Sequence, residues 1–135
     1  MRSISKRGDY AIRGMVYLAS QPPDRVVLVS KIARAMDIPP LFLAKIFQQF
    51  TKLGLLRSFR GSGGGFLLGR PPEEITLCEI VEAVEGPIMP NRCVLSGGAC
   101  NREAGCTVHP VWKKVEKSIV DILSGVTLKD LAKTV

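Results

Sequence analysis

Histidine occurs only once in the sequence, at position 109, and aromatic residues make up only 6% of the chain. A nucleophilic cysteine or serine usually needs a histidine base that an acidic side chain orients. No acidic residue stands beside His109, and no nucleotide or substrate motif accompanies it. The sequence therefore argues against an enzyme, including one with a cysteine nucleophile and His109 as its base.

Long apolar runs are also missing, because no stretch approaches the ~20 residues that span a membrane. Charge and glycine interrupt the basic N-terminal stretch before it could form the apolar region of a secretion signal. We therefore expect a cytoplasmic protein with no membrane partner. Thiols stay reduced in that compartment, so clustered cysteines are expected to bind metal or respond to oxidants rather than form structural disulfides.

Acidic residues are scarce in the first half of the chain. Residues 1–70 hold twelve Lys and Arg against three Asp, a net charge of +9, whereas residues 71–135 hold seven basic against nine acidic residues, a net charge of −2. A polyanion such as nucleic acid would bind to the first half, although a merely solvated basic face has the same composition.

The first half reads as helices separated by proline turns. Ser5 is a candidate N-cap for a helix to about residue 20, and Ser30 is a candidate N-cap for a helix over 31–36. Pro39-Pro40 forces a turn before an amphipathic stretch at 41–54 that ends in glycine. Its predicted buried face comprises Leu43, Ile46, Phe47, Phe50 and Leu53. Two helices joined by a tight turn are typical of a helix-turn-helix.

The next stretch, LLRSFRGSGGGFLLGRPP, predicts a β-hairpin with a glycine-rich tip that carries Arg57, Arg60 and Arg70. A phosphate-cradling loop is disfavoured because no Lys-Ser/Thr pair follows the glycines. A hairpin beside a helix-turn-helix is a wing. A helix fits the major groove of DNA, and an arginine on a thin hairpin fits the narrow minor groove.

Beyond the hairpin, apolar spacing predicts a helix over 75–86, in which Cys78 acts as a small buried hydrophobic residue. A loop over 87–110 holds the other cysteines. Residues 111–123 form an amphipathic helix that is longer than so small a core needs, so part of its face is expected to be an interface. One more short helical turn follows it.

The cysteine pattern is Cys93-x6-Cys100-x5-Cys106-x2-His109. Zinc ribbons usually begin with a tighter pair of cysteines, two to four residues apart. Well-spaced thiolates suit the larger cage of an iron–sulfur cluster, but the spacing alone leaves zinc open. A disulfide switch without metal is a further alternative.

Several stretches together resemble the Rrf-type winged-helix repressors, the family of IscR, NsrR and CymR. The resemblance covers essentially the whole chain, and the tail is most like the IscR branch. It is carried by SKRGDYAIRGMVYLA, by FLAKIFQQFTKLGLLRSFRGSGGGFLLGRPPEEITLCEIVEAVEG, by the Cys-Cys-Cys-x-x-His loop and by HPVWKKVEKSIVDILSGVTLKDL.

The resemblance implies a homodimer that places two recognition helices in successive major grooves of a palindromic operator. By position, the helix residues that contact DNA would be Leu41, Phe42, Ala44 and Lys45, and the wing residues would be Arg57, Arg60 and Ser62. The position of Ala44 is often Glu in this family and takes part in sequence selection. Because alanine cannot accept a hydrogen bond from a base, the family's target sequence does not carry over.

The resemblance also implies an iron–sulfur cluster held by Cys93, Cys100, Cys106 and His109, in the two-iron [2Fe–2S] form. Asp9 of the partner subunit is the alternative fourth ligand, in a four-iron [4Fe–4S] form. The implied function is a repressor whose operator binding responds to redox state, nitric oxide or iron status. The alternatives are a cluster-free thiol-switch repressor and a structural zinc-binding interaction module.

The expected fold class is therefore mainly α with a small β-hairpin wing. Residues 1–86 would form the winged helix-turn-helix domain, residues 87–110 the cysteine-rich cluster-binding loop, and residues 111–135 the dimerisation helix and tail.

Overall fold

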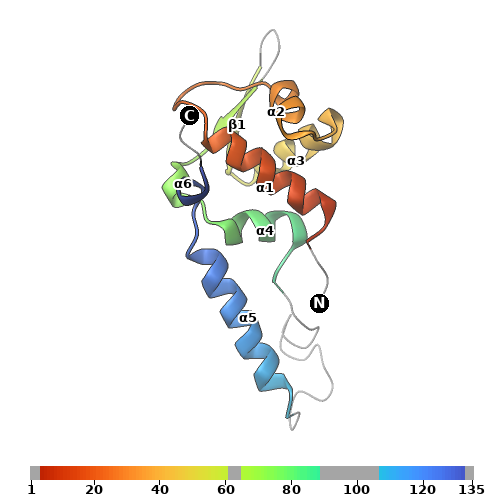
Figure 1. Ribbon diagram of the computed structural model, residues 1–135, viewed down its shortest axis with the longest axis vertical. Coiled ribbons are helices and arrows are strands. Elements are labelled where there is room, and N and C mark those ends of the chain that lie inside the picture. The colour runs from red at the N-terminus through yellow and green to blue at the C-terminus, as the bar shows by residue number, and fades with distance from the viewer. Residues whose placement is uncertain (1–3, 61–64, 89–106, 133–135) are drawn as a thin grey trace.

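The structure, a computed structural model, describes residues 4–60, 65–88 and 107–132. A body of short helices carries a two-stranded hairpin, and one longer helix extends from it (Figure 1). This confirms the mainly α fold with a small hairpin. The elements are α1 (Lys6–Ala19), α2 (Val29–Met36), α3 (Pro40–Lys52), β1 (Leu56–Phe59), β2 (Gly65–Leu68), the 3-10 turn η1 (Pro72–Glu74), α4 (Leu77–Glu85), α5 (His109–Ser124) and α6 (Leu128–Leu131).

Helix α1 begins where the sequence predicts. The Ser5 hydroxyl accepts a hydrogen bond from the Gly8 backbone N–H at 3.1 Å, which caps the first turn. A Cβ at Gly14 would lie 3.0 Å from Leu43 and 3.1 Å from Phe47, so glycine lets α1 approach α3 closely. The buried apolar residues of α1 include Ala11, Met15 and Leu18.

The predicted N-cap at Ser30 is wrong. Helix α2 begins at Val29, two residues before the predicted start at residue 31, and its N-cap residue, Leu28, makes no side-chain cap. The reason is tertiary, because the Val27 backbone pairs with Phe66 of β2 through two hydrogen bonds of 2.9 and 3.1 Å. This pairing sets the direction of the chain just before α2, so the helix starts without a serine cap.

Helix α3 has Pro40 in its first turn and follows α2 across a tight turn, as a helix-turn-helix requires. Leu53 was predicted to share the buried face but is 56% exposed. The helix ends at Lys52, and Gly54, at φ +82°, turns the chain toward β1. The residues of α3 that are buried as predicted are Leu43, Ile46, Phe47 and Phe50.

The hairpin packs directly on α3. Strands β1 and β2 pair antiparallel, with Leu56 opposite Leu68 and Phe59 opposite Gly65. Phe66 meets the Phe47 ring edge-on, with the ring centroids 5.3 Å apart. The arms therefore match the predicted wing, whose tip at 61–64 lies outside the described residues.

The chain returns to this body after α5. Leu77 N–H donates to the Val126 carbonyl at 2.8 Å, and Leu128 N–H donates to the Ile75 carbonyl at 2.9 Å. Because Ile75 pairs in this way, α4 starts at Leu77 rather than at the predicted residue 75. Leu128 is fully buried, so the short α6 ties the end of α5 to the body.

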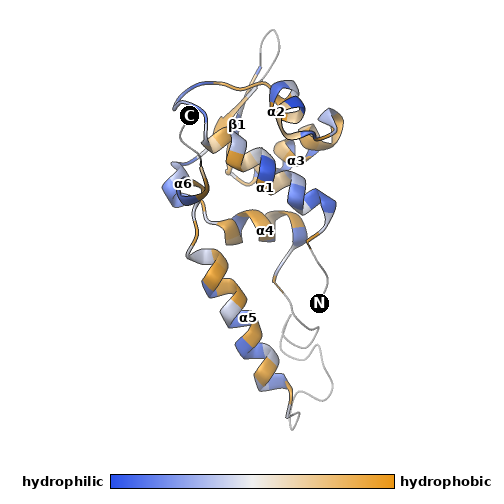
Figure 2. Ribbon diagram, in the orientation of Figure 1, coloured by the Kyte–Doolittle hydropathy of each residue, from blue (hydrophilic) through white to orange (hydrophobic). Residues whose placement is uncertain are grey.

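Helix α5 starts at His109, two residues before the predicted start. Its N-terminal end lies away from the body, and the helix runs back toward α6 (Figure 1). None of its residues is buried in the single chain, although apolar and polar residues alternate along it (Figure 2). A 16-residue helix with no buried residue has an unpartnered apolar side, which agrees with the interface predicted for it. None of the described helices is long and apolar enough to cross a membrane.

Candidate nucleic-acid interface

The first turns of α3 present most of the predicted contact residues to solvent. Leu41 is 82% exposed, Phe42 is 42% exposed, and Lys45 is exposed on the same helix. Ala44 is half-buried, so its methyl group adds little to this surface. The structure thus brings three of the four predicted helix residues onto one accessible side of α3.

This end of α3 is held by α1 and α2. The Phe42 ring meets Tyr10 edge-on at 5.5 Å, and the Arg13 guanidinium lies over the Tyr10 ring at 5.2 Å. Arg13 also donates to the Met36 carbonyl at 2.7 Å, close to the end of α2. The exposed face of α3 is therefore supported by α1 and α2. Arg13 was not among the predicted site residues, although its i, i+4 spacing from Asp9 indicates an ion pair on the helix.

The wing arginines have different surroundings. Arg57 lies over the Phe59 ring at 5.4 Å, and Arg60, next to the tip, is exposed. Arg70 instead forms an ion pair with Glu79 of α4 at 2.7 Å. Arg70 thus joins the base of the wing to α4, while Arg57 and Arg60 extend the basic surface. Ser62 lies outside the described residues.

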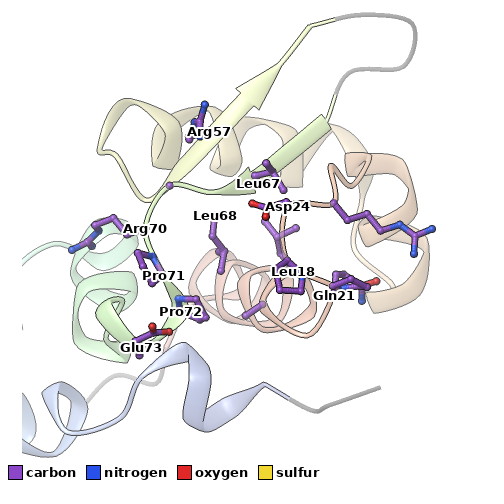
Figure 3. Close-up of a pocket in the computed structure, with 15 residues that line it drawn as sticks. Leu18, Gln21, Asp24, Arg57, Leu67, Leu68, Arg70, Pro71, Pro72 and Glu73 are labelled. Carbon is purple, nitrogen blue, oxygen red and sulfur yellow. The ribbon is translucent and has the colours of Figure 1, made fainter.

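A hollow of about 490 Å³ lies beside the wing, between the end of α1, the turn at 21–25 and the segment 67–73 (Figure 3). Arg57 and Arg70 line it together with Asp24 and Glu73. Among the described residues that line it there is no thiol and no imidazole.

The predicted metal ligands are only partly within the described chain. Cys93, Cys100 and Cys106 lie outside it, whereas His109 is the half-buried first residue of α5. The Asp9 carboxylate pairs with Arg13 of its own chain at 2.9 Å. Across residues 4–60, 65–88 and 107–132, no three His, Cys, Asp or Glu side chains gather into a metal site. A metal site built as predicted therefore depends on the cysteine segment.

Cys78 is the cysteine that the structure describes, and it is 6% exposed in α4. Its burial raises the pKa of its thiol above the usual value, which suppresses the reactive thiolate. The prediction of a small buried hydrophobic residue is confirmed.

We expect Cys78 to resist alkylation at pH 8. Iodoacetamide followed by peptide mass spectrometry should label a small minority of Cys78 in folded protein, and nearly all of it after unfolding in urea. The unfolded sample is the control for intrinsic reactivity. Equal labelling rates in the two states would contradict the buried position.

Comparison with known proteins identifies the family. Residues 4–134 match the family described as Rrf2, iron-dependent transcriptional regulator. The chain belongs to the Rrf2 family. The transcriptional regulator IscR of Xenorhabdus nematophila is 30% identical to it over 130 residues, which cover 96% of this chain and 79% of that protein.

Two solved structures resemble this Rrf2 protein along nearly its whole length. CymR, the global cysteine regulator of B. subtilis, superposes with a TM-score of 0.83 at 27% identity, covering 98% of this chain and 97% of that one. T. potens IscR has a TM-score of 0.76 at 28% identity, covering 96% of this chain and 85% of that one. The protein is thus a winged-helix transcriptional regulator and not an enzyme, as predicted.

Proposed function

We propose that this Rrf2 protein is a homodimeric repressor in the cytoplasm, whose affinity for a palindromic DNA operator is controlled by an iron–sulfur cluster. The observation that carries the proposal is the position of His109. It is the first residue of α5, three residues after Cys106, so a predicted ligand begins the helix that has no buried residue. A change at the ligand site would act directly on the proposed dimer helix.

DNA would meet two neighbouring surfaces of this chain. The exposed side of α3 would enter the major groove, and the wing arginines would enter the minor groove. The proposed contact residues are Leu41, Phe42, Ala44, Lys45, Arg57, Arg60 and Ser62.

A second copy of the chain would cover α5. Val111 and Ile122 are 55% and 68% exposed in the single chain, and other apolar residues of this helix are half-buried. Packing α5 against its copy would remove this apolar surface from water. A two-fold dimer would place two copies of α3 on matching half-sites of a palindrome.

The donor set fits an iron–sulfur cluster. Three thiolates and one imidazole can ligate the two irons of a [2Fe–2S] cluster, which when bound supplies a redox- and oxygen-sensitive centre. His109 would hold the start of α5 to that centre. Asp9 of the partner subunit, with a [4Fe–4S] cluster, is the alternative. We favour His109 over Asp9, because the Asp9 carboxylate already pairs with Arg13 of its own chain.

Anaerobic purification with iron and sulfide quantitation tests the cluster directly. We expect brown protein with visible absorption and with iron and acid-labile sulfide in near-equal amounts. Zinc without sulfide would replace the proposal by a structural zinc module.

A cluster-free thiol switch is the second candidate, because one similar solved structure is an oxidized form of Staphylococcus aureus CymR. Colourless, metal-free protein whose DNA gel shift changes with a thiol reductant would establish that switch and overturn the cluster.

The wing arginine provides a test of the DNA surface. Arg60→Ala should weaken DNA binding and lower the slope of log K against log salt by about one, because one positive charge that releases counterions from the DNA is lost. Arg70→Ala is the matched control, since Arg70 already pairs with Glu79. Anisotropy titrations at several salt concentrations measure both slopes. A slope unchanged in Arg60→Ala, or equally reduced in both variants, would contradict the proposed role of the wing.

A further inference from the structure

The last turn of α4 contains a carbonyl that its own helix cannot satisfy. The Ala83 carbonyl would normally accept from the N–H four residues later, but that residue is Pro87, which has no N–H. The preceding carbonyl, that of Glu82, is satisfied by the Gly86 N–H at 2.9 Å. Ala83 therefore needs a donor from elsewhere in the fold.

Gln49 of α3 supplies that donor. Its side-chain Nε2 donates to the Ala83 carbonyl at 3.1 Å, and its Oε1 accepts from the Arg7 guanidinium of α1. Within the described residues, the bond to Ala83 is the hydrogen bond that joins α3 to α4. Gln49 is half-buried and belongs to the helix that presents Leu41 and Lys45 to solvent.

The same end of α4 is also bound to the start of α1. The Glu85 carboxylate accepts from the Ser5 N–H at 3.1 Å and from the Ser5 hydroxyl at 2.5 Å. Gly86 follows at φ +84°, and the chain then continues toward Cys93. The turn that precedes the cysteine segment is therefore held by α1 and, through Gln49, by α3.

We propose that Gln49 is a positioning residue that couples the last turn of α4, and hence the cysteine segment, to the DNA-facing helix α3. The amide fills both roles at once, as donor to a carbonyl that proline leaves unsatisfied and as acceptor for Arg7. A conformational change at the end of α4 reaches α3 through the Gln49 amide. It changes how α3 is presented to DNA. The inference rests on the proposed cluster control.

The test compares affinities in two states of the full-length protein. The probe is a fluorescein-labelled duplex that the wild-type protein selects from a random-sequence pool. For each variant, anisotropy gives the ratio of affinities of anaerobic cluster-loaded protein and cluster-free protein. In Gln49→Ala this ratio should move toward one by about fivefold, the factor that corresponds to one ordinary hydrogen bond.

Gln48→Ala is the matched control, because Gln48 is the exposed neighbour of the same residue type. It should change both affinities by a common factor and leave their ratio unchanged. Arg7→Ala is a second test variant, to be used if Gln49→Ala fails to fold. Arg7 is exposed, and its loss removes the hydrogen bond to Gln49 Oε1, so the ratio should again move toward one. Amide hydrogen exchange at Gly86 should also become faster in cluster-free Gln49→Ala, which reports the loosened turn without DNA.

Two different results would overturn the coupling role of Gln49, and they distinguish its failure from failure of the proposed cluster control. A wild-type ratio that persists in Gln49→Ala and Arg7→Ala would remove Gln49 from the coupling while leaving cluster control intact. A ratio of one already in the wild type would overturn the proposed cluster control itself and the coupling with it.

Discussion

Cys106→Ser should abolish the visible absorption of anaerobically purified protein and reduce its bound iron to background. A hydroxyl is a far poorer ligand for iron than a thiolate, and the three cysteines of the cysteine-rich segment all belong to the proposed ligand set. The fourth cysteine, Cys78, is buried in α4 within the folded body. Visible spectra and iron quantitation of matched preparations measure the loss.

Cys78→Ser is the control for this substitution. It makes the same chemical change at a cysteine outside the proposed site, so the spectrum and iron content should match the wild type. Loss of the cluster in Cys78→Ser, or its retention in Cys106→Ser, would contradict the ligand set. His109→Ala and Asp9→Ala then decide the fourth ligand, and an intact cluster in both would remove each of them from that role.

Phe47→Ala should reduce the free energy of unfolding by about 3–5 kcal/mol, the range for deleting a buried phenylalanine. Phe47 is fully buried, packs on Phe66 of the wing and lies against Gly14 of α1. Its removal leaves a cavity where α1, α3 and the hairpin meet. Urea unfolding at one fixed protein concentration measures the loss, since the stability of a dimer depends on concentration.

Phe42→Ala separates this packing effect from a general effect of losing a ring. Phe42 lies on the same helix but is 42% exposed, with Tyr10 as its aromatic neighbour. Its loss should cost about 1 kcal/mol of stability and should chiefly weaken DNA binding. Equal destabilisation by the two substitutions would contradict the described core of the winged helix.

The helices of this fold could be predicted because their causes are local. Ser5 caps α1 through its own side chain, and the apolar spacing of α3 matches its buried residues as far as Phe50. The predicted helix starts were wrong where a segment distant in the sequence determines the backbone conformation. Ser30 lost its capping role because Val27 pairs with Phe66, thirty-nine residues further along the chain. Spacing alone cannot show such a pairing.

In the candidate site, too, locally determined features could be predicted, whereas contacts between distant segments could not. The exposure of Leu41 and Arg60 follows from helical spacing and from the glycine-rich tip beside the wing. The ion pair of Arg70 with Glu79 and the bond from Gln49 to Ala83 depend on how helices are arranged in space. Pro87 leaves the Ala83 carbonyl without its helical donor, but nothing in the sequence indicates that Gln49 would supply one.

The most direct test of cluster control is a single titration performed twice on one preparation. Anaerobic, cluster-loaded protein is titrated against the selected duplex by fluorescence anisotropy, and the same sample is titrated again after anaerobic chelation has removed its iron. Under cluster control we expect the affinity to change by at least about tenfold, a coupling within the range usual for allosteric proteins, and to return to the first value when the cluster is rebuilt. Identical affinities for the loaded and cluster-free protein, on every duplex selected by either form, would contradict cluster control.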